Sequence, residues 1–200
     1  MKRRYSLPIL VLCSIFLAAG LQASNLRQGY IVTKTNHHLT GYIGSINHTE
    51  YGSMVEFVND FGTPYFLHPA LIKGFAFLEG PVFREYESRF WRRQWIFLQV
   101  IYPGEDVRLL KSPDFITSYQ IINGMLSSNT KEKAEYWTDI PGRRFIPVKR
   151  WGFRRNMRRL VEEVSPNLAD KIGQTGYRYK DLVSIIQEYD RIMRQGTRRL

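Results

Sequence analysis

Two short stretches combine arginine with aromatic side chains in a way that could bind anions. Residues 89–95 read RFWRRQW and residues 149–155 read KRWGFRR. A guanidinium group holds a phosphate or a carboxylate through two parallel hydrogen bonds, and tryptophan beside arginine is typical of interaction hot spots and membrane interfaces. We predict a partner-binding surface formed by Arg150, Trp151, Arg154, Arg155, Arg158 and Arg159.

The distribution of charge along the chain points to the same end. Residues 24–142 carry 11 basic and 12 acidic side chains, whereas residues 143–200 carry 15 basic and 6 acidic ones, and 12 of those 15 are arginine. A segment with a net charge of +9 favours an anionic partner or surface. Two plainer interpretations stay open: the arginines form the solvated face of a helix, and Trp151 and Phe153 dock that helix on the rest of the protein.

No pattern of nucleophiles or phosphate-binding glycines predicts an enzyme. The sequence contains no Gly-x-Ser-x-Gly, no P-loop and no Gly-x-Gly-x-x-Gly, so neither a serine hydrolase nor a nucleotide cofactor is indicated. Glu85 and Glu87 share one face of an expected strand, and Glu105 precedes Asp106 in a turn. Paired carboxylates can hydrolyse glycosides, but such pairs are more often solvated surface. We predict no catalysis and no cofactor, with a carboxylate-dependent hydrolase as the weaker alternative.

The histidines do not have the spacing of a metal site. His37 and His38 are neighbours in an expected turn, His48 lies between Asn47 and Thr49, and His68 precedes a proline. No pair has i, i+4 spacing with a nearby carboxylate, and Cys13 is the only cysteine. A zinc site normally draws four ligands from such residues, so we predict none.

Two groups of elements position these residues. The first group consists of strands. Between residues 27 and 148, short β-branched and aromatic runs alternate with Gly, Asn and Pro, which is typical of antiparallel sheet. We predict strands at residues 29–33, 39–46, 53–58, 64–67, 74–78, 82–86, 95–102, 107–111, 116–122, 134–138 and 144–148. A helical turn is expected at residues 68–72, a basic bend at 89–93 and an exposed loop at 125–133. Such a series indicates a barrel, roll or sandwich.

The last third of the chain has a helical period. Phe153, Met157, Leu160, Val161 and Val164 form one apolar stripe, which predicts an amphipathic helix. A Ser-Pro pair predicts a short helix over residues 166–172, ended by a glycine, and a second stripe predicts a helix over residues 179–194. The expected fold class is α+β: an antiparallel β-rich domain over residues 24–148 and a basic helical segment of about three helices over residues 149–200.

The first 23 residues have the order of a signal peptide. Three basic residues precede an apolar run of about 15 residues, and small residues surround Ala23. A membrane span needs about 20 apolar residues, so we predict cleavage after Ala23, with an uncleaved anchor as the alternative. Because the only cysteine, Cys13, falls in this leader, export brings no disulfide. An exported protein meets anionic lipid, acidic glycan or envelope proteins, and export disfavours nucleic acid as the partner.

The layout resembles a group of small secreted proteins of Bacteroidetes-type bacteria. The resemblance is carried by hydrophobic and turn positions at 41–43, 55–57, 65–75, 97–100, 104–110, 160–172 and 182–189. It implies an exported protein with a β-rich domain and a helical tail, and it implies no activity, cofactor or catalytic residue. Where that group often has Tyr-Asn at the end of the last helix, this chain has Tyr189 and Asp190.

These observations together predict a non-enzymatic envelope protein, periplasmic or outer-envelope associated, that acts as an interaction or structural module. Its basic helical segment would contact an anionic surface or a protein partner. The alternative is a binding protein for an acidic lipid or glycan. The sequence leaves the oligomeric state open, and no apolar run after the leader is long enough for a second membrane segment.

Overall fold

A computed structural model describes residues 26–91, 93–132, 134–142 and 145–197. The predicted leader, with its cleavage site and Cys13, lies outside the described residues. The strands are β1 Arg27–Thr33, β2 His38–Thr49, β3 Gly52–Asn59, β4 Pro64–Leu67, β5 Ile72–Glu79, β6 Val82–Trp91, β7 Gln94–Pro103, β8 Arg108–Lys111, β9 Phe115–Ile122, β10 Met125–Glu132, β11 Tyr136–Asp139 and β12 Ile146–Val148. The helices are α2 Phe153–Glu162, α3 Pro166–Lys171, the short 3-10 helix η1 Tyr179–Asp181 and α4 Leu182–Thr197.

The strands form one continuous, mostly antiparallel sheet, which confirms the predicted fold class. Their order is β10-β9-β2-β1-β5-β6-β7-β8-β11-β12, and β3 extends from β2 to carry β4. Among the described strands, β10 and β12 lie at the two ends of this path and do not pair with each other, so the sheet is open and the barrel, one of the predicted alternatives, is not formed. Strands β1 and β2 form the first hairpin, in which Gly29 lies opposite Gly41.

Three local predictions were wrong. The basic bend expected at residues 89–93 begins later, because β6 continues to Trp91. Residues 125–133 were expected to be a loop, but β10 pairs with β9 along its whole length, from Met125 opposite Ile122 to Glu132 opposite Phe115. Its polar residues hide the strand because neither face is buried and no apolar alternation results. The helical turn expected at residues 68–72 is a hydrogen-bonded turn, in which the Leu71 amide donates to the His68 carbonyl at 2.9 Å, and Ile72 already belongs to β5.

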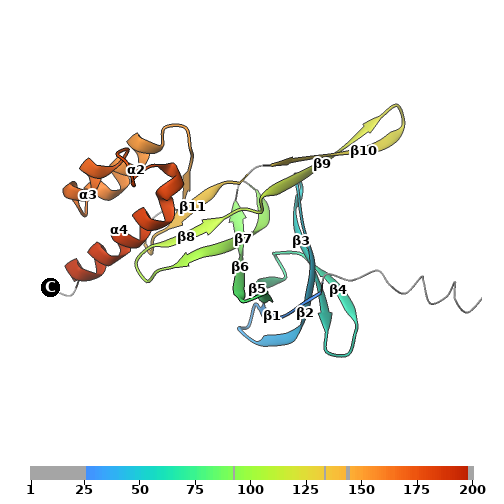
Figure 1. The fold of residues 1–200 in the computed structure, drawn as a ribbon. Helices are drawn as coiled ribbons and strands as arrows, with labels where there is room; N and C mark the ends of the chain where they lie inside the picture. Colours follow the sequence, from blue (N-terminus) through green and yellow to red (C-terminus); the bar gives the residue numbers. More distant parts are fainter. Residues whose placement is uncertain (1–25, 92, 133, 143–144, 198–200) are drawn as a thin grey trace, which may run out of the picture.

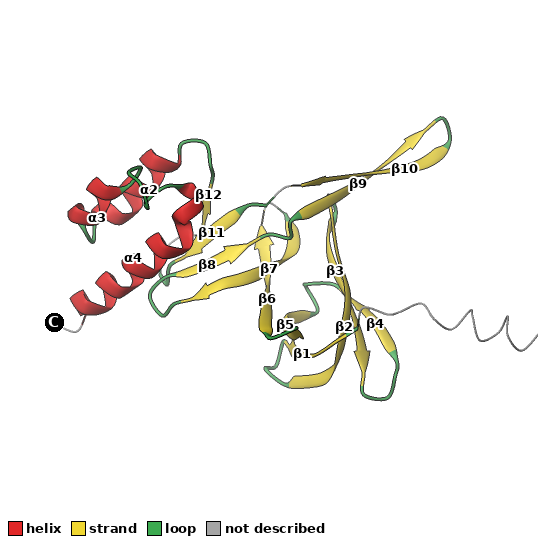
Figure 2. Cartoon of the chain, viewed as in Figure 1, coloured by secondary structure: helices red, strands yellow, loops and turns green. Residues whose placement is uncertain are grey.

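The curled sheet encloses one apolar core, and the helices enclose another (Figures 1 and 2). The first core consists of Ile31, Ile43, Val55, Phe57, Ile72, Phe75, Phe77 and Phe97. In the second, residues of α2, α3 and α4 pack on Val107, Leu109, Ile140 and Val148. Strand β7 serves both sides of the sheet, because Phe97 faces the first core while Leu98 packs with Leu110 and Trp137 on the opposite face.

A buried carboxylate fixes α4 to the turn between β7 and β8. The side chain of Asp190 is fully buried and accepts hydrogen bonds from the Asp106 and Val107 amides at 2.9 and 3.0 Å. It also accepts from the Tyr102 hydroxyl at 2.8 Å and from Arg194 Nε at 3.0 Å. Burial alone would raise the pKa of Asp190, but these donors outweigh it and hold the pKa below its ordinary value. The carboxylate therefore stays ionised as a structural anchor.

Candidate anion-binding site

Helix α2 presents its arginines to solvent because its apolar stripe is committed to the core. Phe153, Met157 and Val161 are buried at i, i+4 and i+8, so the intervening positions project outward. Gly152 precedes the helix in the left-handed conformation, with φ of 72°, and Trp151 before it is 84% exposed. One interpretation of the sequence expected both Trp151 and Phe153 to dock the helix on the rest of the protein. Phe153 does so, whereas Trp151 does not.

Five arginines and this exposed tryptophan line one open hollow, here called the arginine hollow. Its volume is about 810 Å³. Its lining residues are Arg150, Trp151, Gly152, Phe153, Arg154, Arg155, Arg158, Gly173, Arg178 and Tyr179. The structure thus brings together five of the six predicted partner-binding residues.

Arg159, the sixth predicted residue, lies elsewhere. It lines a separate hollow of about 310 Å³ with Met157, Leu160 and Glu163. Helical geometry explains the separation, because each residue turns about 100° around the axis. Arg158 is therefore about 40° from Arg154, and Arg159 is about 140° from it.

Sequence reasoning missed the far wall of the arginine hollow, which is built from Gly173, Arg178 and Tyr179. Arg178 is exposed and comes just before η1. Tyr179 packs edge-on against Phe153, with ring centroids 5.6 Å apart. Burial, followed by the nearby Tyr136, raises the pKa of Tyr179, so its hydroxyl stays protonated at neutral pH. The only sequence signal for Arg178 was its place in the basic segment.

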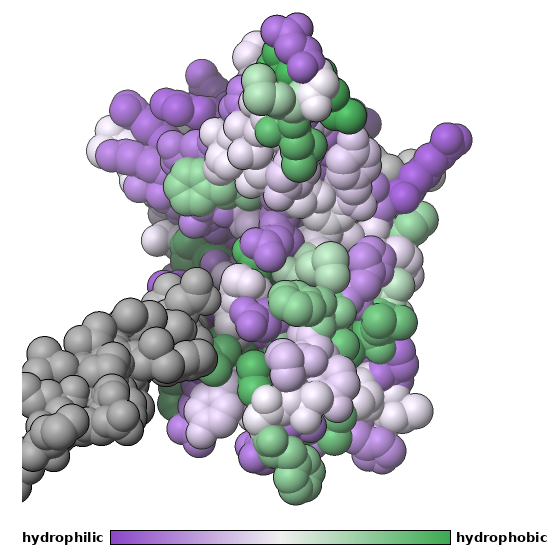
Figure 3. Space-filling model, turned by 90° about the vertical axis from the view of Figure 1, so that its right-hand side faces the viewer, coloured by the Kyte–Doolittle hydropathy of each residue, from purple (hydrophilic) through white to green (hydrophobic). Residues whose placement is uncertain are grey.

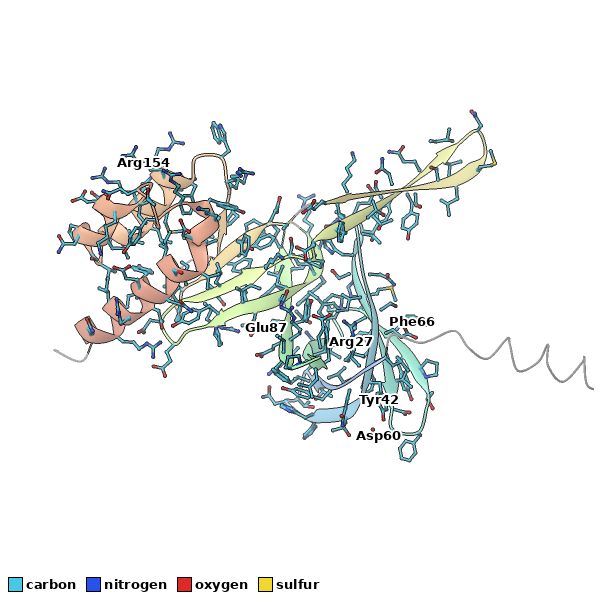
Figure 4. All side chains as sticks on the ribbon, viewed as in Figure 1. Arg27, Tyr42, Asp60, Phe66, Glu87 and Arg154 are labelled. Atoms are coloured by element: carbon cyan, nitrogen blue, oxygen red, sulfur yellow. The ribbon has the colours of Figure 1, made fainter. Side chains whose placement is uncertain are left out.

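A glycine lets one arginine lie along this wall. Gly173 has φ of 97°, and a Cβ atom built there would lie 2.8 Å from Arg154 Cδ and 3.0 Å from its Nε. The stem of Arg154 therefore packs directly against Gly173, and a larger residue there would displace it. Figure 4 shows where Arg154 lies on the helical segment.

The positive charge of the hollow is mostly uncompensated. Arg158 forms an ion pair with Asp170 at 2.8 Å. Within the described parts of the chain, Arg150, Arg154, Arg155 and Arg178 form no ion pair with a carboxylate. The first turn of α2 contains no acidic residue, and Gly152 gives no side-chain cap, so the positive end of the helix dipole adds to the same field. This arrangement suits a multiply charged anion.

A second charged cluster lies on the sheet, well away from the arginine hollow (Figure 4). Arg89 donates to Glu87 at 2.9 Å and to Asp139 at 2.5 Å, and Arg108 donates to the other oxygen of Glu87. Glu87 and Glu85 also line a hollow of about 300 Å³. The fold thus brings Glu87 near a second acid, Asp139, that the sequence did not pair with it. Both carboxylates are engaged by guanidinium groups, as expected of a structural ion-pair network.

The histidines of the described residues engage neighbouring side chains and backbone groups of the sheet and its turns. His38 stacks on Tyr30, with ring centroids 4.7 Å apart, His48 Nδ1 lies 2.7 Å from the Ser53 hydroxyl, and His68 Nδ1 accepts from the Ala70 amide at 3.2 Å. In the described part of the chain no three His, Cys, Asp or Glu residues are grouped as metal ligands. No helix within the same residues is long and apolar enough to cross a membrane.

Comparison with known proteins gave no match to a protein-family model, to a curated protein or to a solved structure.

Proposed function

We propose that the protein is an exported, non-enzymatic interaction module of the cell envelope, and that its arginine hollow binds a partner rich in phosphate or carboxylate groups. The observation that carries the proposal is the convergence of five arginines and an exposed tryptophan on one hollow. The arginines come from α2, the segment before it and the segment before η1, which are up to 28 positions apart in the sequence.

Electrostatics favours an anion in this hollow over a merely solvated helix face. Guanidinium groups around one cavity repel each other, and only Arg158 is compensated by a carboxylate among the described residues. An anion placed between them removes this repulsion and accepts several charge-assisted hydrogen bonds, each worth about 1.5–3 kcal/mol. The packing of Arg154 against Gly173 limits the freedom of one donor, which lowers the entropic cost of binding.

The size and openness of the hollow indicate a ligand larger than a single phosphate. Ligand sites commonly have volumes of about 300–1,000 Å³, and the arginine hollow is near the upper end at about 810 Å³. Trp151 at its rim offers a flat apolar surface beside the charges. A charged group carried by a lipid or a glycan has both features, so these remain the two sources of the ligand.

The hydrolase alternative receives less support. The carboxylates that converge, Glu87 and Asp139, are paired with Arg89 and Arg108. A glycosidase needs one carboxyl group to donate a proton and another to face the substrate. Both oxygens of Glu87 accept hydrogen bonds from guanidinium groups, so the cluster is better explained as a brace between β6, β8 and β11.

Binding of two soluble polyanions tests the proposal. Inorganic tripolyphosphate and polygalacturonate offer phosphate and carboxylate groups separately, and their affinities can be measured by calorimetry at several salt concentrations. Replacing Arg154, Arg155 and Arg178 with Gln should weaken binding roughly 10- to 100-fold, as expected for the loss of several charge-assisted hydrogen bonds. It should also flatten the salt dependence, because fewer counterions are exchanged.

The matched control removes the same charge elsewhere. Replacing Arg84, Arg159 and Arg191 with Gln gives the same net charge but leaves the hollow intact. Its affinity should stay within about threefold of wild type, since non-contacting surface charges are screened. Equal losses in both variants would show that only net charge matters and would contradict a built site. Absence of binding to either probe by the wild-type chain would also contradict the proposal.

A further inference from the structure

The hairpin of β9 and β10 projects from the body of the protein. Outside the hairpin, β9 is joined to the described sheet by a single bridge between Thr49 and Thr117 and by a hydrogen bond from the Tyr119 amide to Glu50 Oε1 at 3.3 Å, and every residue of β10 is exposed. Figure 1 shows the hairpin running away from both cores. A two-stranded hairpin alone is marginally stable in water. A long hairpin that packs on neither core therefore indicates that its tip contacts a partner.

The tip is apolar on both faces. Asn123 and Gly124 have φ of 51° and 77°, as in the tight I′ turn of a two-residue hairpin. Next to this turn, Ile122 pairs with Met125 on one face and Ile121 with Leu126 on the other. All four side chains are more than half exposed.

Below the tip both faces are polar. On one face Gln120 pairs with Ser127, and on the other Tyr119 pairs with Ser128 and Thr117 with Thr130. No residue from 115 to 130 is charged. The hairpin therefore changes from polar to apolar along its length rather than from one face to the other.

The apolar tip above a polar shaft indicates which kind of partner the hairpin contacts. A flat protein surface would cover one face of the tip and leave the other in water, whereas a lipid bilayer surrounds an inserted tip on all sides. Two apolar pairs at about 3.4 Å per residue reach about 7 Å, which matches the insertion depth of about 5–10 Å for interfacial elements. Tyr119, one pair below, would lie at the headgroup level where tyrosine is enriched.

Helix α2, which carries Arg154, Arg155 and Arg158, and the end of the hairpin lie toward the same side of the molecule. In Figure 1, helix α2 and the end of the hairpin both lie at the top of the view, and Arg154 is labelled there in Figure 4. Figure 3 looks along the hairpin and shows hydrophobic side chains gathered near the top of that face. One plane can thus touch the apolar tip and the cationic helix together, and an anionic bilayer complements both.

We infer that the tip formed by Ile121, Ile122, Met125 and Leu126 inserts into the interfacial layer of an anionic lipid bilayer while the arginine hollow rests on its headgroups. The electrostatic half of this inference rests on the proposed function. The apolar half rests on the hairpin alone and is tested separately.

A fluorophore at the tip reports insertion directly. All variants carry Cys13→Ser so that one new cysteine can be labelled, and any contribution of residues 1–25 is common to them. An environment-sensitive dye on Met125→Cys should shift to the blue with vesicles of phosphatidylcholine and phosphatidylglycerol, and spin labels in the lipid should quench it. The same dye on Ser118→Cys, in the polar part of the hairpin, should do neither.

A tip variant measures the contribution of insertion to binding. In it, Ile121, Ile122, Met125 and Leu126 are replaced with Thr, which retains the preference for strand. Vesicle affinity at high salt should fall roughly tenfold or more with the loss of this apolar burial. A control that replaces the exposed Phe61, Leu71, Val82 and Phe83 with Thr should stay within about twofold of wild type. Thermal unfolding monitored by circular dichroism verifies that both variants fold.

Each other outcome overturns the inference. If the wild-type chain binds vesicles and the arginine variant does not, but the tip label stays unshifted, the proposed function stands and insertion is wrong. A tip label that shifts with protein concentration in the absence of lipid shows pairing between copies of the hairpin instead. If no vesicles are bound while tripolyphosphate or polygalacturonate is, the arginine hollow serves a soluble ligand or a glycan.

Discussion

The Tyr102 hydroxyl donates to Asp190 at 2.8 Å and so joins the end of β7 to the middle of α4. The same carboxylate accepts two backbone amides from the turn after β7 and the side chain of Arg194. Hydrogen bonds to a charged group stabilise more than neutral ones, and leaving a buried partner unsatisfied is costly. Asp190 therefore determines how firmly the helical segment is attached to the sheet.

Replacing Asp190 with Asn should destabilise the protein by about 3 kcal/mol, because a neutral amide leaves Arg194 uncompensated and turns a donor toward other donors. Urea unfolding measures the loss. Replacing the adjacent exposed Arg191 with Gln should change the free energy of unfolding by less than about 0.5 kcal/mol. Equal effects of the two changes would show that the buried network adds nothing.

The pair of Asp190 and Tyr102 should also determine how the stability of the protein depends on pH. The pKa of Asp190 is lowered in the folded state, so its contribution is fully present above the unfolded value of about 3.9 and is lost as pH falls through the folded pKa. The pKa of Tyr102 is raised by burial and by the hydrogen bond to Asp190, so its contribution is lost only as pH rises beyond about 10. Unfolding free energies of wild type and Asp190→Asn should converge toward acid pH. A constant gap from pH 7 to pH 2 would contradict this assignment.

Replacing Gly173 with Ala should weaken polyanion binding through Arg154. The new Cβ would displace the Arg154 stem, and the positive φ adds a backbone cost of about 1 kcal/mol. Gly176 is the matched control, since its φ is also positive, at 84°, but a Cβ there meets nothing within 4 Å. Both variants should lose similar stability, and only Gly173→Ala should lose affinity for tripolyphosphate, as calorimetry can show.

Replacing Glu87 with Gln should lower stability by about 1–2 kcal/mol, because Arg89 and Arg108 then share Asp139 alone. Glu85→Gln is the control, since Glu85 lines the same hollow and forms no ion pair among the described residues. Chemical unfolding distinguishes the two. If Glu85→Gln costs as much as Glu87→Gln, the ion-pair cluster is not a brace.

Most elements could be predicted because their apolar residues follow the period of the element. The stripe from Phe153 to Val161 in α2 and the run from Ile96 to Leu98 in β7 are buried as expected. Strand β10 was missed because a strand with both faces in water leaves no such pattern. Its clearest signal was the Asn123-Gly124 pair, a recognised hairpin turn.

The charged clusters could be predicted only where their members are close in sequence. Arg150 to Arg158 were found together because one turn and one helix carry them. Arg178 joins them only through the packing of α3 and η1 against α2, and Asp139 reaches Glu87 only through the sheet order β6-β7-β8-β11. Neither juxtaposition leaves a local pattern in the sequence.

Strand β7 places Phe97 in one core and Leu98 on the opposite face, while Tyr102 reaches the helical segment. Loosening either side therefore exposes apolar surface on the other, so the sheet and the helices should melt in a single cooperative transition. Such a transition would abolish the arginine hollow and the hairpin together, so neither surface would outlast the other as the protein unfolds.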